Sequence, residues 1–171
     1  MRHNDSMSKH HAAASTPATV ALTQAGISFT VHPYEHDPST ALGYGLEAAA
    51  AIGVVPEQVF KTLCAYVDGQ LCVGVVPVSG KLDMKALATA LGGKKAQMAP
   101  PADAERSSGY VVGGISPVGQ RKALPTVVDE TAQLYDVVYV SGGRRGLDIG
   151  LAPADLVRVT GAVVAAIAQD A

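Results

Sequence analysis

Tryptophan is absent from this 171-residue sequence, and aromatic residues of all kinds make up only 5% of it. Because aromatic side chains are scarce, the core must be built from valine, leucine, isoleucine and alanine, a composition that suits a sheet covered by small-residue helices. With 48% hydrophobic and 16% charged residues, the chain has apolar material for one compact core and too few residues for two ordinary domains. We therefore expect one domain.

Cysteine is nearly absent as well: Cys64 and Cys72 are the only two, and both lie within apolar runs. We interpret them as buried free thiols rather than as a disulfide. The sequence has no CxxC pair and no histidine–cysteine cluster with zinc-ligand spacing, so we expect no metal and no other cofactor. It also lacks an apolar run of about 20 residues and the apolar core of a secretion signal. We expect a cytoplasmic protein with no membrane partner.

Positive charge is not in excess either, because the formal net charge is -2. This value excludes a strongly basic protein that binds nucleic acid through its overall field, so any such contact would be local. One local basic group follows Gln120, and a second lies in the glycine-rich turn 141–146, where Arg144 and Arg145 are adjacent. Two guanidinium groups suit phosphate. A solvated hairpin tip is an equally supported interpretation of the turn.

All five histidines lie within the first 36 residues. Three of them belong to residues 1–15, a polar, alanine-rich stretch without periodicity that we expect to be a disordered extension. His32 and His36 have metal-ligand spacing, but nearby prolines prevent the helix that would bring i and i+4 together, so a hydrogen-bonding role is favoured. Without a histidine near its glycine-rich loops, the sequence shows no evident general base for neutral pH.

From Thr16 onward, hydrophobic periodicity and turn residues predict short elements in close succession. The segment 162–167 is predicted as a strand, with a helix as the alternative. No βαβ alternation dominates, which disfavours a Rossmann fold and predicts an α+β fold with a mixed, partly closed, barrel-like sheet and short flanking helices. Helices are predicted over 17–25, 41–52, 84–91, 101–107 and 153–160, helical turns over 56–58 and 130–134, and strands over 27–32, 59–67, 70–76, 95–98, 126–129, 136–140 and 147–151.

The stretch 109–119 joins an apolar, strand-like run to a glycine-rich turn. It nearly matches the G-x-S-x-G nucleophile elbow, but Pro117 follows Ser116 and has no N–H to donate to an oxyanion. We therefore disfavour Ser116 as a nucleophile. The backbone N–H groups of Gly113, Gly114 and Ile115 instead suit a cradle for an anion or a carbonyl oxygen. A hairpin that only turns the chain is the alternative, at even weight.

Two charged residues lie inside predicted strands. Lys61 is flanked by Phe60 and Thr62 and shares its parity with apolar residues, a position that is costly unless the ammonium group meets a ligand or a partner. A lysine that extends into solvent at the strand end is an equal alternative. Asp148 lies between two apolar residues, and because aspartate is disfavoured in strands we expect it to have a hydrogen-bonding role.

Four blocks of the sequence resemble one family over residues 17 to 168, nearly the whole predicted domain. The family is the YbaK/EbsC group of bacterial Cys-tRNA(Pro) deacylases, which is related to the editing domain of prolyl-tRNA synthetase. The blocks occur in order and at the family's spacing. They are Tyr34-Glu35-His36-Asp37-Pro38, Val59-Phe60-Lys61-Thr62-Leu63, Arg106-Ser107-Ser108-Gly109-Tyr110 with Gly113-Gly114-Ile115-Ser116-Pro117, and Tyr139-Val140-Ser141-Gly142-Gly143-Arg144-Arg145-Gly146-Leu147-Asp148-Ile149.

The resemblance implies a barrel-like α+β fold over 16–171 and hydrolysis of mischarged Cys-tRNA(Pro), with aminoacyl-tRNA as the partner and prolyl-tRNA synthetase as a candidate second partner. It also implies substrate assistance, in which the cysteinyl thiol attacks its own ester. That route fits a protein without an evident base, since a thiol is a few per cent thiolate at pH 7. The expected catalytic residues are Lys61, Gly113 and Asp148, and the expected substrate-binding residues are Tyr34, Gly114, Ile115, Ser116, Pro117, Ser141 and Arg144.

Two positions depart from the family pattern: Phe60 replaces a frequent tyrosine, and Gly150 replaces a common acidic residue. Both departures bear on substrate preference. A non-catalytic module that binds tRNA ends or nucleotides through the same loops is the main alternative function, and a serine esterase that uses Ser116 is a weaker one.

Overall fold

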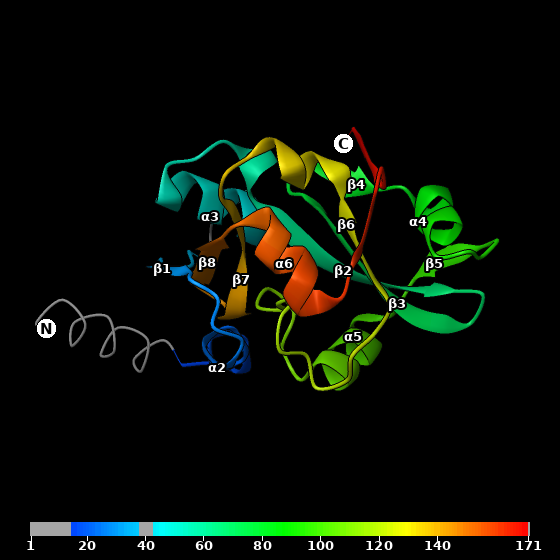
Figure 1. Cartoon of the computed structure of the whole chain (residues 1–171), viewed down its shortest axis with the longest axis horizontal. Helices are drawn as coiled ribbons and strands as arrows, with labels where there is room; N and C mark the ends of the chain where they lie inside the picture. Colours follow the sequence, from blue (N-terminus) through cyan, green and yellow to red (C-terminus); the bar gives the residue numbers. More distant parts are fainter. Residues whose placement is uncertain (1–14, 38–42, 171) are drawn as a thin grey trace, which may run out of the picture.

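The computed structural model describes residues 15–37 and 43–170 (Figure 1). The expected disordered extension therefore lies outside the described residues except for Ser15, as do the first two residues of the helix predicted over 41–52. The described helices are α2 (Pro17–Gln24), α3 (Gly43–Ile52), α4 (Met84–Ala90), α5 (Pro101–Ser108) and α6 (Pro153–Thr160), with 3-10 turns η1 (Pro56–Gln58) and η2 (Glu130–Leu134). The described strands are β1 (Thr30–Pro33), β2 (Phe60–Val67), β3 (Gln70–Pro77), β4 (Gly80–Leu82), β5 (Ala96–Met98), β6 (Thr126–Asp129), β7 (Val138–Arg144), β8 (Leu147–Leu151), β9 (Val163–Ala165) and β10 (Ala168–Asp170).

The strands form three sheets within the described residues. A five-stranded sheet has the order β5-β2-β3-β6-β9, an antiparallel three-stranded sheet has the order β1-β8-β7, and β10 pairs with β4. The larger sheet is mixed, because β6 runs parallel to β3 and to β9 while β2 and β3 form a hairpin. A single parallel bridge between Val59 and Tyr139 joins the two larger sheets. The α+β prediction is confirmed; the pairings do not close a barrel, so that part stays a prediction.

Capping residues set the ends of several helices. The side chain of Thr16 accepts a hydrogen bond from the Thr19 N–H in a capping box ahead of α2, with a proline in the first turn. Asp83 caps α4 in the same way, and Gly161 ends α6 in the left-handed conformation. These ends are local in origin, because each uses side chains or glycines next to the helix it terminates.

The described strands depart from the sequence prediction most at β1, at β7 and in the β4–β10 pair. β1 begins at Thr30 rather than at residue 27, because the N–H of Ile27 still donates to the carbonyl of Leu22 at the end of α2. β7 begins two residues late and continues four residues beyond its predicted end, through a register shift between Ser141 and Arg144 that absorbs two glycines. The segment predicted over 162–167 contains β9, and the short pair β4–β10 was not predicted.

The three-stranded sheet separates two apolar clusters. Val140 and Ile149 on one face join the main core, to which α2 contributes Leu22 and α6 contributes Leu156. The helix α3 covers the other face through Ala48 and its neighbours. Both cysteines are buried free thiols, which confirms that prediction. The second face of this sheet, between α3 and β2, is the one that meets the candidate site.

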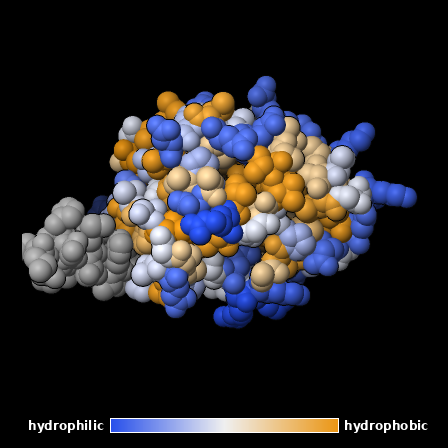
Figure 2. Space-filling view, in the orientation of Figure 1, coloured by the Kyte–Doolittle hydropathy of each residue, from blue (hydrophilic) through white to orange (hydrophobic). Residues whose placement is uncertain are grey.

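The visible surface is a mixture of polar and apolar residues (Figure 2). A larger apolar area lies beside α6, toward the C-terminal strands. No helix in the described part of the chain is long and apolar enough to cross a membrane.

Candidate active site

A cavity of about 370 Å³ opens between β2 and the second face of the three-stranded sheet. Its walls come from β2, α3, the β5–α5 connection and the loop 112–115. Segments far apart in the sequence therefore meet around one space.

Of the residues predicted for the site, six line the cavity and four do not. Those that line it are Tyr34, Lys61, Gly113, Ile115, Ser141 and Asp148. Those that do not are Gly114, Ser116, Pro117 and Arg144.

Strand register explains how the polar residues of the sheet reach the cavity. Asp148 on β8 lies directly opposite His32 on β1 and directly opposite Ser141 on β7. Residues that oppose each other in a ladder project from the same face. Tyr34 continues the β1 series, since its backbone N–H donates to the carbonyl of Gly146 at 2.8 Å. A row of polar side chains thus lies on the face opposite the main core.

Asp148 is only 5% exposed, and burial raises the pKa of its carboxyl group to about 7. Burial does so because a low-dielectric environment disfavours the ionised form. Near neutral pH this carboxyl group therefore exchanges a proton readily. The sequence shows no evident general base for neutral pH, and burial in the folded protein makes Asp148 a candidate for that role.

Burial also raises the pKa of the Tyr34 phenol, and the nearby Asp148 carboxylate raises it further. Tyr34 is therefore neutral over the physiological range and retains an O–H donor. Its hydroxyl lies 3.5 Å from the carbonyl oxygen of Tyr44. The phenol is thus placed between the polar row and the start of α3.

Lys61 is half-buried on β2 and lines the cavity. Desolvation lowers the pKa of its ammonium group. Lys61 takes part in none of the three ion pairs found among the described residues. Of the two interpretations of this lysine, the structure favours a cation that meets a ligand over one that extends fully into solvent.

The glycine-rich loop requires two of its glycines for close approach. Gly113 has a φ of +90°, and a Cβ atom there would lie 2.7 Å from the Tyr44 ring. A Cβ atom on Gly114 would lie 2.6 Å from the Arg144 backbone. The loop is therefore pressed between α3 and the β7–β8 turn.

The same loop offers fewer amide donors than the sequence indicated. The N–H of Gly114 donates to the carbonyl of Val111 at 2.8 Å, so it belongs to the turn and not to a cradle. The N–H groups of Gly113 and Ile115 donate none of the hydrogen bonds found among the described residues. These two amides, on residues that line the cavity, remain available to a ligand.

Ser116 is fully buried and lies away from the cavity lining. Its Oγ accepts a hydrogen bond from the Val118 N–H at 3.2 Å, and its carbonyl oxygen accepts one from the Gln120 side chain at 3.0 Å. These contacts close the turn around Pro117. The geometry gives no support to a serine esterase at Ser116.

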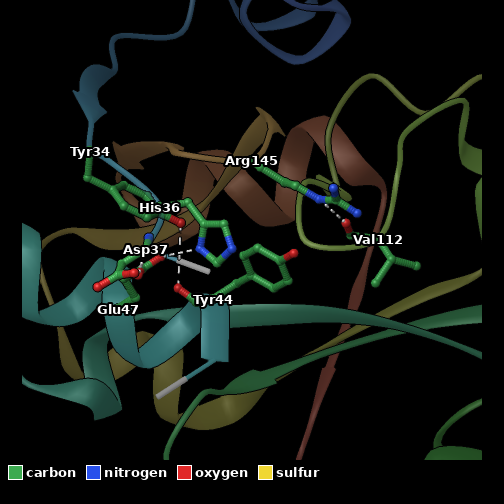
Figure 3. Close-up of polar contacts among 7 residues, drawn as sticks. All are labelled: Tyr34, His36, Asp37, Tyr44, Glu47, Val112 and Arg145. Atoms are coloured by element: carbon green, nitrogen blue, oxygen red, sulfur yellow. Dashed lines mark hydrogen bonds and ion pairs between the residues drawn. The ribbon is translucent and has the colours of Figure 1, made fainter. Parts of the chain in front are cut away.

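A cluster at the cavity mouth was missed by sequence reasoning (Figure 3). His36 Nδ1 lies 2.7 Å from the Glu47 carboxylate, which also accepts the Asp37 N–H at 2.9 Å. The Asp37 amide and then the His36 ring hold the pKa of Glu47 below its usual value. The His36 ring stands 4.5 Å from the Tyr44 ring, and the Arg145 guanidinium carbon lies 5.6 Å from the Tyr44 centroid.

The sequence carried one signal for this cluster. Tyr44 stands between Gly43 and Gly45 at the start of a predicted helix, where two poor helix formers flank an aromatic residue. A Cβ atom on Gly45 would clash with Val78, so this glycine lets α3 approach the strand connection. Close packing accounts for Gly45, whereas Gly43 is favoured by its φ of +77°, with nothing within 4 Å of a Cβ atom placed there.

The described residues contain no group of three or more histidine, cysteine or acidic side chains that could hold a metal ion. The cavity instead combines one lysine, one carboxyl group with a pKa near neutrality, the two amide donors and the hydroxyl groups of four lining residues, Tyr34, Tyr44, Thr62 and Ser141. Such a set can bind a polar, partly anionic molecule and exchange a proton with it.

Residues 44–159 match the family model of the aminoacyl-tRNA editing domain. The protein EbsC of Enterococcus faecalis, named as a candidate Cys-tRNA(Pro)/Cys-tRNA(Cys) deacylase, is 40% identical over 114 residues, which cover 66% of this chain and 69% of EbsC. The crystal structure of a candidate trans-editing enzyme for prolyl-tRNA synthetase is similar with a TM-score of 0.79 and 26% identity, over 91% of this chain and 97% of that one. The structure of the protein APE2540 gives the same TM-score and identity over 90% and 100%. The resemblance noted in the sequence is thereby confirmed, and the chain belongs to the aminoacyl-tRNA editing domain family.

Proposed function

We propose that this protein is a trans-editing aminoacyl-tRNA deacylase that hydrolyses the ester of mischarged Cys-tRNA(Pro). Membership in the editing-domain family supports the reaction class, and the relative EbsC, by its name, supports cysteinyl-tRNA as the substrate. The observation that carries the proposal is the cavity itself, in which Lys61, Asp148 and the Gly113 amide surround one space.

The proposed reaction begins at the thiol of the substrate. Asp148, with a pKa of about 7, takes the thiol proton, and the sulfur attacks the carbonyl carbon of the same cysteinyl group. The C–S bond forms, the ester C–O bond breaks, and the proton returns from Asp148 to the departing ribose oxygen. The free tRNA leaves, and water then opens the four-membered thiolactone to give cysteine.

The backbone N–H groups of Gly113 and Ile115 polarise the ester carbonyl group of the substrate. Charge develops on the carbonyl oxygen as sulfur attacks, and fixed N–H donors stabilise that charge without reorganisation. One such donor contributes about 3 kcal/mol in comparable oxyanion holes. Two donors on a loop that glycine sterics hold in place would offset part of the ring strain of the thiolactone.

Lys61, Tyr34 and Ser141 have positioning roles in this proposal. The half-buried Lys61 ammonium engages the phosphate of the terminal adenosine, while the neutral Tyr34 phenol and the Ser141 hydroxyl orient the aminoacyl group against Asp148. All three line the cavity with Asp148. Holding thiol and ester together is the largest contribution expected from a site of this kind.

A deacylation panel tests the proposal. Purified protein is mixed with tRNA(Pro) charged with cysteine, alanine, serine or proline, and the release of each amino acid is followed, with and without prolyl-tRNA synthetase. Cysteine should be released fastest by orders of magnitude. Binding of charged tRNA without release of any amino acid would favour the alternative, a non-catalytic module that recognises tRNA ends.

A further inference from the structure

We propose that Arg145 binds a backbone phosphodiester of the tRNA 3′ strand where that strand leaves the cavity. This inference rests on the proposed function for the identity of the ligand. It concerns a residue that lies outside the cavity lining, on the turn between β7 and β8. The composition of the turn suits both arginines to phosphate, but the expected substrate-binding residue of the sequence analysis was Arg144 and not Arg145.

The structure separates the two arginines. Arg145 Nε donates a hydrogen bond of 2.8 Å to the carbonyl oxygen of Val112, and its guanidinium lies over the Tyr44 ring (Figure 3). Both Val112 and Tyr44 line the cavity. Arg144 makes none of the side-chain hydrogen bonds or ion pairs found among the described residues. Arg145 is therefore fixed at the mouth, and Arg144 is not.

The contact that fixes Arg145 leaves its phosphate-binding edge available. The bond to Val112 uses Nε alone, so the two terminal NH2 groups retain four N–H donors. Arg145 is exposed and takes part in none of the ion pairs among the described residues. A guanidinium that is oriented in advance loses little side-chain entropy when it binds a planar pair of phosphate oxygens.

The partner of Arg145 is itself held at both ends. The Val112 N–H donates to the Glu105 carboxylate at 2.8 Å, while its carbonyl accepts from Arg145. Tyr44 is held against the loop because Gly113 has no side chain. The guanidinium thus has a defined place relative to the cavity. A chain whose terminal ester is inside the cavity, and that leaves it beside Val112 and Tyr44, would carry its phosphates past this guanidinium.

The charge at the mouth fits the same ligand. The chain has a net charge of -2, so a phosphodiester needs a local cation to approach this surface. Lys61 lies inside the cavity and Arg145 at its edge, so two cations follow one another along the path of the 3′ strand. We assign the phosphate of the terminal adenosine to Lys61 and a phosphodiester further out to Arg145.

Substrates of increasing length test the assignment. The variants Arg145→Ala, Arg145→Lys and Arg158→Ala are compared on cysteinyl-adenosine, which has no phosphate, and on cysteinyl-CpCpA. Arg145→Ala should lower kcat/KM on the longer ester about tenfold or more and leave the nucleoside ester unchanged, since a charge-assisted hydrogen bond is lost only where phosphate is present. Arg145→Lys should restore part of the loss as a point charge. Arg158, an exposed arginine on α6 paired with Asp155, controls for net charge.

Equal loss on both esters would show that Arg145 acts only by holding the loop, and no loss on either would also overturn the proposal. Binding of uncharged CpCpA, measured by fluorescence anisotropy, provides a readout that does not need hydrolysis. Arg145→Ala should weaken this binding and reduce the slope of log Kd against log salt by about 0.7, the value for one phosphate of a single strand. If the unmodified protein binds CpCpA in this way and hydrolyses neither ester, the proposed function fails and the phosphate subsite stands. If Arg145→Ala binds CpCpA as tightly as the unmodified protein does, the subsite fails.

Discussion

Asp148 and Ser141 lie directly opposite each other in the β7–β8 ladder, and both line the same cavity. Asp148 also lies opposite His32 on β1. The neighbouring residues Val140 and Ile149 project from the other face of the sheet and pack into the main core. The three-stranded sheet therefore buries one face in apolar packing and places a carboxyl group on the other. Asp148 is therefore buried and takes part in none of the ion pairs found among residues 15–37 and 43–170, which leads to the first prediction.

Asp148→Asn should stabilise the protein at pH 8. The folded-state pKa is raised to about 7 and the unfolded value is about 3.9, so the folded state binds the proton more tightly and stability falls as pH rises between these values. Removing the charge should raise the free energy of unfolding at pH 8 on the order of 4 kcal/mol, and by almost nothing at pH 4. Urea denaturation at pH 8 and at pH 4 measures the free energy of unfolding of the variant and of the unmodified protein. Asp155→Asn, at a paired and more exposed carboxylate on α6, is the matched control. An Asn variant that is less stable at pH 8 would contradict the pKa assignment.

The rate of cysteine release should depend on pH through the same carboxyl group. In the unmodified protein, single-turnover rates should rise with pH through about 7, where Asp148 becomes able to accept the thiol proton. In Asp148→Asn the rate should be lower at pH 7. The midpoint of its pH–rate profile should shift toward pH 8.5, about the pKa of a free thiol. Rates are corrected for spontaneous ester hydrolysis. An unchanged midpoint in the variant would exclude Asp148 as the base.

Lys61→Met should abolish most deacylation while the protein remains folded. The ammonium group is desolvated and has none of the ion pairs found among the described residues, so its removal costs the fold little. A lost charge-assisted contact to phosphate should lower kcat/KM by about tenfold or more. Circular dichroism checks the fold, and Lys85→Met on the exposed face of α4 is the control. Wild-type rates in Lys61→Met, or an unfolded variant, would remove Lys61 from the proposed site.

Ser116→Ala should retain substantial activity and lose stability. The buried Oγ accepts the Val118 N–H, and an unsatisfied buried donor costs about 1–3 kcal/mol. Thermal unfolding and deacylation are measured on the same preparation. Background-level activity together with an acyl group trapped on Ser116 would restore the serine esterase interpretation.

Alkylation of the substrate sulfur should nearly stop the reaction. The same tRNA is charged with cysteine, S-methyl-cysteine, serine and alanine, and the rates are compared at matched concentration. Only cysteine brings a nucleophile that is partly ionised at neutral pH. Release of alanine or S-methyl-cysteine as fast as cysteine would mean that the protein activates water, and the thiol mechanism would be wrong.

The sequence by itself determined the elements and most of their ends. Helix caps at Thr16 and Asp83 and the left-handed turn at Asp68-Gly69 depend on residues next to one another, so local chemistry specifies them. The sequence also singled out Lys61 and Asp148, because a charge inside a strand is a local contradiction that requires an explanation.

Only the tertiary structure decided what those charges do. The pKa of Asp148 depends on burial by α3 and β2, which lie far away in sequence, and no local pattern reports that burial. The contacts of Arg145 with Val112 and Tyr44 at the edge of the cavity also depend on the tertiary structure, because the three residues come from three separate segments. Arg144 and Arg145 are equivalent neighbours in the sequence. The register shift in β7 and the carbonyl of Val112 distinguish them, because a hydrogen bond depends on position in space rather than on residue type.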